Sequence, residues 1–242
     1  MLNVVCWKWK QLNYRSKFIP KRVGTLRNMV ARNLSIPHRF LCITDEPEGI
    51  DCETIPIWTE PDIVLPQGRP NCYRRLKLFS KDAQSILNCD EDDYVLSIDL
   101  DTVIVSDFTD LIQDVIDRNV DFKIWGDTAK NTPYNGSFWM LKLNSRNHVW
   151  ETLLKAGERA PILTKDKNYI GSDQGWMAYS MGEKEERWTS KDGIYSFRNE
   201  LTKTLKKDDL PENAKIVFFH GKEDPWNKPI KERYEWVNEF YG

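Results

Sequence analysis

The chain has 242 residues, of which 40% are hydrophobic and 12% aromatic, so a globular protein with a sizeable core is expected. Its 35 Lys and Arg residues nearly balance its 37 Asp and Glu residues, which excludes the overall basic character typical of nucleic-acid-binding proteins. No stretch approaches the ~18 apolar residues of a membrane span, and the start turns polar too early for a signal peptide.

Strands and helices alternate through the first part of the chain. Apolar, β-rich runs predict strands at residues 2–7, 39–44, 52–57 and 94–98. A helix is expected from Pro20, because Val23, Leu26 and Val30 lie near one face. A second helix is predicted over 71–87, after a proline-containing loop at 58–70 that is long enough to be functional.

The later elements continue this pattern and then become less regular. Apolar periodicity predicts helices at residues 108–116, near 149–154, at 172–181 with Ser172 as the cap, and at 230–241. Strands are predicted at residues 120–125, 137–143 and 215–220. Alternation of strands and helices up to about residue 150 indicates an α/β fold with a largely parallel sheet. No linker divides the chain, so residues 1–242 are expected to form a single domain.

Asp99 and Asp101 interrupt the apolar segment "YVLSIDLDTVIV" at the carboxyl end of its strand. Burying a charge is costly unless the charge is paired or bound to a metal. Residues two apart in a strand point the same way, so both carboxylates are predicted to face one point. A hard divalent cation between them, Mg²⁺ or Mn²⁺, would remove their repulsion and would also bind a diphosphate.

Three segments resemble the motifs of one family of enzymes. "YVLSIDLD" resembles the Asp-x-Asp metal motif of GT-A glycosyltransferases. "GSDQGWMAY" and "FFHGKEDPW" are similar to the Asp-Gln and the C-terminal His, Gly, Lys and Pro-Trp elements of glycosyltransferase family 8, in that family's order. The resemblance extends as a pattern over residues 2–226 and implies a Rossmann-like GT-A fold, with a mixed, mainly parallel sheet flanked by helices.

The same resemblance implies a function. The chain would be a metal-dependent hexosyltransferase that moves a sugar from a nucleotide-sugar donor, a UDP-sugar, to an acceptor hydroxyl with retention of configuration. The nucleotide-binding half would span residues 1–105, and residues 106–242 would complete the metal site and bind the acceptor. The acceptor itself is unidentified and would be a glycan, a protein or a small molecule.

The resemblance also assigns roles to individual residues. Implied ligands of the Mn²⁺ or Mg²⁺ ion are Asp99, Asp101 and His220. The implied catalytic pair beside the donor sugar is Asp173 and Gln174, with Asp173 as the general base if the enzyme instead inverts. Lys222 would meet the diphosphate, although the C-terminal motif is spaced more closely here than in the family. Trp226 would contact the substrate.

Further candidates come from residue chemistry alone. Arg74 or Arg75 is expected to turn inward toward the donor phosphates, because a guanidinium matches phosphate oxygens. Aromatic residues available to stack on the base are Trp7, Trp9 and Tyr14. Asn135, Gly136 and Ser137 precede a strand, where a simple turn and a contact with sugar hydroxyls are both possible interpretations.

Two other classes of function stay open. One is a haloacid-dehalogenase-like phosphatase, whose Asp-x-Asp-Gly-Thr motif "DLDTVIV" approaches but does not match. The other is a non-catalytic protein that binds nucleotides or carbohydrates on a GT-A scaffold. The five cysteines form no Cys-x-x-Cys pair, so neither a disulfide scaffold nor a zinc site is expected, and the predicted location is cytoplasmic.

Overall fold

A seven-stranded sheet forms the centre of the protein, in the order β3-β2-β1-β4-β7-β6-β8. The computed structural model describes residues 1–10, 19–63, 71–126, 132–206, 208–220 and 223–242. The strands are β1 (Leu2–Lys8), β2 (His38–Thr44), β3 (Glu53–Pro56), β4 (Tyr94–Ile98), β6 (Phe122–Gly126), β7 (Tyr134–Lys142) and β8 (Glu186–Trp188). All but β8 were predicted from the sequence, and the α/β fold class is confirmed.

Strand direction places several carboxyl ends at one edge of this sheet. β1 pairs in parallel with β2 and β4, and β2 with β3. β7 is antiparallel to both β4 and β6, while β6 is parallel to β8. β4, β6 and β8 therefore run in the same direction, and their carboxyl ends open at the edge where α/β sheets bind ligands.

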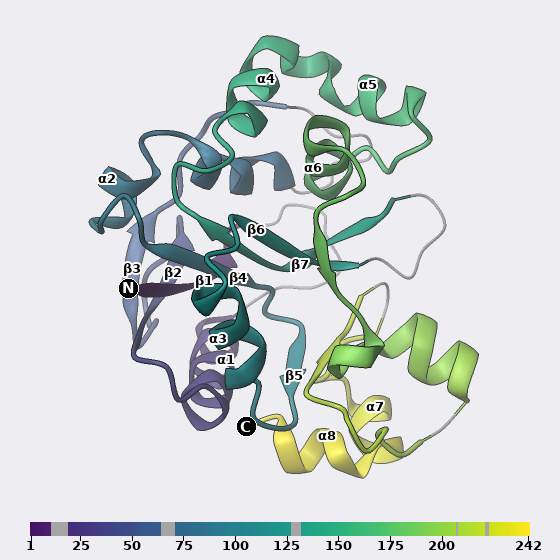
Figure 1. Cartoon of the computed structure of the whole chain (residues 1–242). Coiled ribbons are helices and arrows are strands. Elements are labelled where there is room, and N and C mark those ends of the chain that lie inside the picture. The colour runs from purple at the N-terminus through teal and green to yellow at the C-terminus, as the bar shows by residue number, and fades with distance from the viewer. Residues whose placement is uncertain (11–18, 64–70, 127–131, 207, 221–222) are drawn as a thin grey trace.

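Helices cover both faces of the sheet (Figure 1). One face carries the 3₁₀-helix η2 (Cys72–Phe79) and the helices α2 (Ala83–Leu87), α4 (His148–Ala156), α5 (Ala160–Asp166) and α6 (Asp173–Met181). The other face carries α1 (Pro20–Asn33), α3 (Thr109–Asp117) and the C-terminal part of the chain. Each layer buries its own hydrophobic cluster against the sheet, as expected for a sheet covered on both faces.

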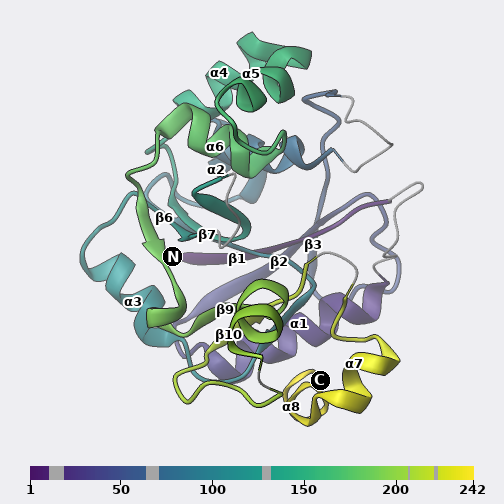
Figure 2. The same ribbon diagram turned by 90° about the vertical axis from the view of Figure 1, so that its right-hand side faces the viewer.

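A second, three-stranded sheet lies within the C-terminal part, in the order β5-β10-β9. Its strands are β5 (Thr102–Ile104), β9 (Ile194–Ser196) and β10 (Ile216–Phe218), with β10 antiparallel to β5 and parallel to β9. The π-helix η5 (Phe197–Leu205) and the helices α7 (Lys228–Arg233) and α8 (Glu235–Phe240) complete this part (Figure 2). β5 falls within the apolar segment around Asp99 and Asp101, and β10 within the strand predicted at residues 215–220, whereas β9 was not predicted.

Two predicted helices differ from the observed ones, and a third lacks its predicted cap. The helix predicted over 71–87 is instead η2 followed by α2, with extended backbone at Ser80 between them. Extended backbone at Tyr234 likewise divides the predicted terminal helix into α7 and α8. Ser172 precedes α6 as predicted, but its side chain makes no capping hydrogen bond. The spacing of apolar residues indicates which side chains are buried, and it does not reveal where one helix ends and the next begins.

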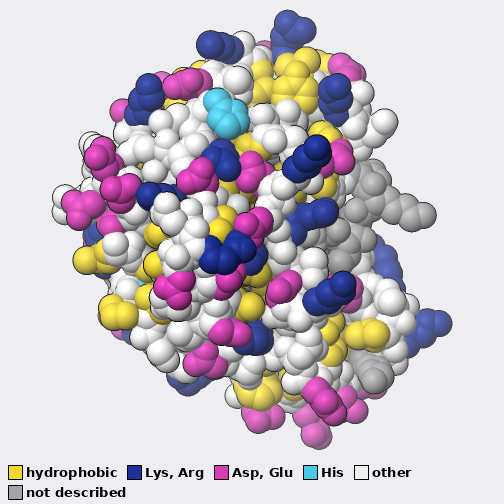
Figure 3. Space-filling view, viewed as in Figure 1, with side chains coloured by type: hydrophobic (Ala, Val, Ile, Leu, Met, Phe, Trp, Pro, Cys, Tyr) yellow, Lys and Arg dark blue, Asp and Glu magenta, His cyan; other side chains and the backbone are white. Residues whose placement is uncertain are grey.

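Surface charge and cysteine state agree with the composition. Acidic and basic side chains are interspersed on the face shown in Figure 3. All five cysteines are free thiols. No helix in the described part of the chain has both the length and the hydrophobicity that crossing a lipid bilayer requires.

Candidate active site

Asp99 and Asp101 lie in the short bend between β4 and β5, at the ligand-binding edge of the large sheet. The Asp99 backbone N–H donates to the Ser137 carbonyl on β7 at 3.0 Å. The Phe219 N–H, just after β10, donates to the Asp101 carbonyl at 2.8 Å. The bend is therefore held by the large sheet on one side and the small sheet on the other, and strand alternation no longer fixes where its side chains point.

Arg75 connects three elements at this edge. Its Nη1 donates to the Asp99 carboxylate at 2.6 Å and to the Gly136 carbonyl at 3.1 Å. Its Nη2 forms an ion pair with Asp173 at the start of α6. The side chains of Arg75 and Asp173 are only 9% and 3% exposed, against 25% for Asp99. Arg75 is thus the buried member of the Arg74–Arg75 pair, and its partners in this structure are carboxylates; a contact with donor phosphates stays a prediction.

Electrostatics keep Arg75 charged. Burial lowers the pKa of Arg75, but the charges of Asp173 and Asp99 outweigh burial and raise its pKa above the ordinary value. Burial raises the pKa of the Asp99 carboxyl above its usual range, against the lowering effect of Arg75 and of a hydrogen bond from Ser137. Two carboxyl groups thus share one guanidinium, through charge-assisted contacts that are stronger than neutral hydrogen bonds.

Gln174 and Gly136 form the adjoining wall. The Gly136 N–H, on β7, donates to Gln174 Oε1 at 3.1 Å. A Cβ atom at Gly136 would lie 2.9 Å from Arg75 Nη2 and 3.2 Å from Asp173 Oδ2. Glycine therefore lets the strand approach the charged cluster, and three candidate residues, Gly136, Asp173 and Gln174, lie close together.

His220 follows β10 and contacts the small sheet. Its Nε2 lies 2.6 Å from Ser196 Oγ, at the end of β9. The Ser196 N–H in turn donates to Glu200 Oε2 at 2.7 Å. Trp125, at the end of β6, has its ring centroid 6.3 Å from that of His220. Sequence gave no signal for Ser196, because its contact with His220 depends on the pairing of β9 with β10.

Asp101 has different neighbours from Asp99. Burial, opposed by Arg22, raises the pKa of the Tyr241 phenol to about 12, and the charges of Asp101 and Asp224 add to this rise. Asp101 therefore acts electrostatically on the C-terminal segment, whereas Asp99 contacts Arg75. The convergence of the two carboxylates on one point stays a prediction.

The residues implied for a metal fit Mn²⁺ or Mg²⁺ in their chemistry, since they offer carboxylate oxygens and one imidazole. The pairing of β5 with β10 also places Asp101 opposite Phe219, the residue before His220. Across the described ranges, however, no three His, Cys, Asp or Glu side chains are gathered closely enough to hold a metal ion. The metal site stays a prediction that rests on Asp99, Asp101 and His220.

The aromatic candidates for base stacking divide into three cases. Trp7 is 3% exposed and donates from Nε1 to Ser97 Oγ at 2.8 Å, so it packs in the core here. Trp9 is half-buried with its ring edge-on to Trp7, which leaves it the better candidate. Tyr14 lies outside the described residues.

The remaining predicted residues are scattered around the site. Asn135 and Ser137 belong to β7. The turn before this strand, which the sequence had allowed as an interpretation, is not observed at these residues. Arg74 is half-buried, and its carbonyl accepts from Trp58 Nε1 at 2.6 Å. The Arg22 guanidinium lies 4.5 Å from the Trp226 ring centroid. Lys222 lies outside the described residues.

Solved structures of two glycosyltransferases share this fold. The galactosyltransferase LgtC, in complex with donor and acceptor sugar analogs, matches with a TM-score of 0.60 and 13% identity over 99% of this chain and 96% of LgtC. A glutamine-to-glutamate active-site mutant of LgtC matches with a TM-score of 0.61 and 12% identity, with the same coverage of both chains. Glycosyltransferase GlyE from Streptococcus pneumoniae TIGR4, in its apo form, matches with a TM-score of 0.57 and 14% identity over 97% of this chain and 59% of GlyE.

The comparison by sequence was negative, since no family model and no curated protein matches the chain. At 12–14% identity the structural likeness establishes the fold. Chemistry has to be argued from the side chains themselves.

Proposed function

From the GT-A fold of this chain, we propose that it is a glycosyltransferase that moves a sugar from a nucleotide-sugar donor to an acceptor hydroxyl. One observation supports this most strongly: Arg75 joins Asp99 and Asp173 next to Gln174 at the ligand-binding edge of the sheet. Alternating donors and carboxylates of this kind hydrogen-bond neighbouring sugar hydroxyls, and burial makes each of those bonds stronger than at the surface.

The donor would be a UDP-sugar, bound mainly by the half of the domain up to residue 105. Arg75 and Asp173 would bind the hydroxyls of the transferred sugar, and the amide of Gln174 would lie beside the anomeric carbon, with retention of configuration. Trp9 would stack on the base, and Arg74 and Lys222 would approach the diphosphate. The five free thiols agree with the proposed cytoplasmic location, since disulfides are rare there.

Asp99, Asp101 and His220 would hold the Mn²⁺ or Mg²⁺ ion. Such an ion, when bound, neutralises the charge that develops on a diphosphate leaving group. The protein itself contributes the neighbouring fixed charges. In the described structure Arg75 contacts the Oδ1 atom of Asp99, and Ser196 contacts the Nε2 atom of His220.

The fold weakens the phosphatase alternative, because both matched proteins are glycosyltransferases. A non-catalytic binding protein remains as the second candidate on the same scaffold. Turnover separates it from an enzyme, because a binding protein would be stabilised by a nucleotide sugar without releasing nucleotide.

A thermal-shift screen with UDP-glucose and UDP-galactose, each with and without Mn²⁺, tests the proposal directly. A ligand present at 100 times its Kd stabilises the native state by about 2.7 kcal/mol. Nucleotide release should then be measured with the best donor. We expect Mn²⁺-dependent stabilisation and turnover, both lost in Asp101→Asn and His220→Asn.

The matched control is Asp166→Asn, which removes an exposed carboxylate from α5 and should behave like the wild type. Absence of stabilisation by any nucleotide sugar would refute the proposed function. Stabilisation without nucleotide release would favour the binding protein.

A further inference from the structure

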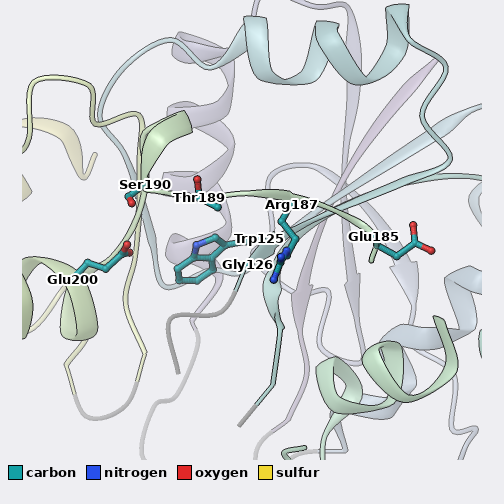
Figure 4. A pocket seen from close by; sticks show the side chains of 7 residues that line it. All are labelled: Trp125, Gly126, Glu185, Arg187, Thr189, Ser190 and Glu200. Carbon is teal, nitrogen blue, oxygen red and sulfur yellow. The ribbon is translucent and has the colours of Figure 1, made fainter. Parts of the chain in front are cut away.

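A groove of about 570 Å³ runs along β8, the edge strand of the large sheet (Figure 4). Its lining includes Trp125, Glu185, Arg187, Thr189, Ser190 and Glu200. Figure 4 shows Arg187 between Glu185 on one side and Trp125 and Glu200 on the other. None of these residues belongs to the proposed donor site.

One end of this groove adjoins the candidate active site. Trp125 is the groove residue whose ring centroid lies 6.3 Å from that of His220. Glu200 accepts from the N–H of Ser196, whose hydroxyl contacts His220. The carboxyl ends of β6 and β8 also open at the same edge as Asp99. A molecule in the groove could therefore extend to the reacting atoms.

Arg187 has unused hydrogen-bonding capacity in the groove. Its side chain is exposed and makes no hydrogen bond or ion pair within the described ranges. The guanidinium can therefore donate to oxygen atoms of a bound molecule. Trp125 is fully buried and its Nε1 is inaccessible, so this residue forms part of the groove wall and does not donate to a ligand.

The lining as a whole is polar and mixed in charge. Arg187 supplies donors, Glu200 supplies a carboxylate, and Ser190 supplies a hydroxyl that can donate or accept. Pockets of about 300–1,000 Å³ hold ligands of drug size, closer to a short oligosaccharide than to one hexose. A peptide added to β8 is less favoured, because this strand has only three residues and apolar anchoring pockets are missing from the lining.

We propose that the groove along β8 binds the sugar units of an oligosaccharide acceptor that lie behind the reacting hydroxyl. This inference rests on the proposed glycosyltransferase function and adds the class of acceptor. Arg187 acts as a specificity residue for the second and later sugars. It is not expected to affect the donor, which binds at the Arg75 cluster.

The test compares acceptors of increasing length in wild type and Arg187→Gln. Suitable probes are methyl glucoside, cellobiose and cellotriose, and methyl galactoside with lactose. Transfer rates and donor hydrolysis are measured with the donor found in the screen. Binding of the same saccharides is measured by saturation-transfer NMR, which needs no turnover. Lys191→Gln is the matched control, because this exposed cation neighbours Ser190 but does not line the groove.

For the wild type, KM should fall about tenfold or more from a monosaccharide to its di- or trisaccharide. Arg187→Gln should remove that advantage and the NMR contacts of the second sugar, and should leave donor hydrolysis and monosaccharide transfer unchanged. Lys191→Gln should retain the advantage.

Equal KM for short and long saccharides in the wild type would overturn the proposal, as would an unchanged advantage in Arg187→Gln. Transfer to a serine-containing peptide but to no saccharide would also overturn it, while the glycosyltransferase function would stand. Absence of all nucleotide-sugar turnover would instead refute the proposed function, and NMR binding would then decide on the groove alone.

Discussion

Replacing Arg75 by Met should destabilise the fold strongly, because the buried Asp173 and the half-buried Asp99 would lose their cation. Hydrogen bonds to charged groups contribute about 1.5–3 kcal/mol each, and Arg75 makes one such contact to Asp99 and one to Asp173. Asp173 is 3% exposed, so its contact with Arg75 should contribute its full free energy, while the contact of Asp99, which is 25% exposed, is partly screened by water. We therefore expect a loss of about 3–5 kcal/mol, the range seen when a buried ion pair loses one partner.

Urea denaturation at pH 7.5, followed by tryptophan fluorescence, measures this loss. A thermal melt should show a decrease in Tm of about 6–20 °C, at about 2–4 °C per kcal/mol for a chain of this size. Arg75→Lys should recover only part of the stability, because an ammonium group cannot contact both carboxylates as a guanidinium fork does. Adding Asp173→Asn to Arg75→Met should also recover part, since it removes one of the unpaired charges.

The loss should also depend on pH. The pKa of Asp99 is already above its usual value with Arg75 present, and removing Arg75 takes away a charge that lowers it. A carboxyl with a raised folded-state pKa stabilises the fold most below its unfolded-state pKa of ~3.9, and this contribution is lost as pH rises through the folded-state value. The destabilisation should therefore be greatest near neutral pH and smaller near pH ~4. The control Arg159→Met replaces an exposed arginine and should leave the free energy of unfolding unchanged. If it does, a loss of less than about 1 kcal/mol for Arg75→Met at pH 7.5, as for surface ion pairs, would refute a buried charged cluster.

Two further predictions concern glycine packing and thiol chemistry. Gly175→Ala should unfold or displace the start of α6, because its Cβ would lie 1.8 Å from the Ile170 carbonyl oxygen. The control Gly24→Ala lies in α1, where a Cβ meets nothing within 4 Å, and should stabilise the fold by about 0.5–1 kcal/mol. Equal Tm values for the two variants would contradict the clash at Gly175. Burial raises the thiol pKa of Cys52 and of Cys89 to about 11. At pH ~8.5 iodoacetamide should therefore modify these two thiols roughly 100-fold more slowly than a free cysteine. Rapid alkylation of either thiol, measured by mass spectrometry, would disprove the raised pKa.

The sequence alone determined the layered α/β fold and the position of the charged bend. Long apolar runs report burial on both faces of a parallel sheet, and their alternation with amphipathic segments leaves few possible arrangements. Asp99 and Asp101 were recognisable for the same reason, because two adjacent charges inside an apolar strand segment need a compensating partner. The motif resemblance around Asp173 and His220 predicted the GT-A fold, and the solved structures share that fold.

Only the tertiary structure decided which partners these side chains have. Arg75 and Asp173 are nearly one hundred residues apart, and their ion pair depends on how η2 and α6 pack over the same face of the sheet. The contact of His220 with Ser196, and the groove beside Trp125 and Arg187, depend on three-residue strands whose pairing no periodicity reveals. Side-chain convergence of this kind is set by packing between elements distant in sequence, so the residue pattern can indicate the chemistry but not its geometry.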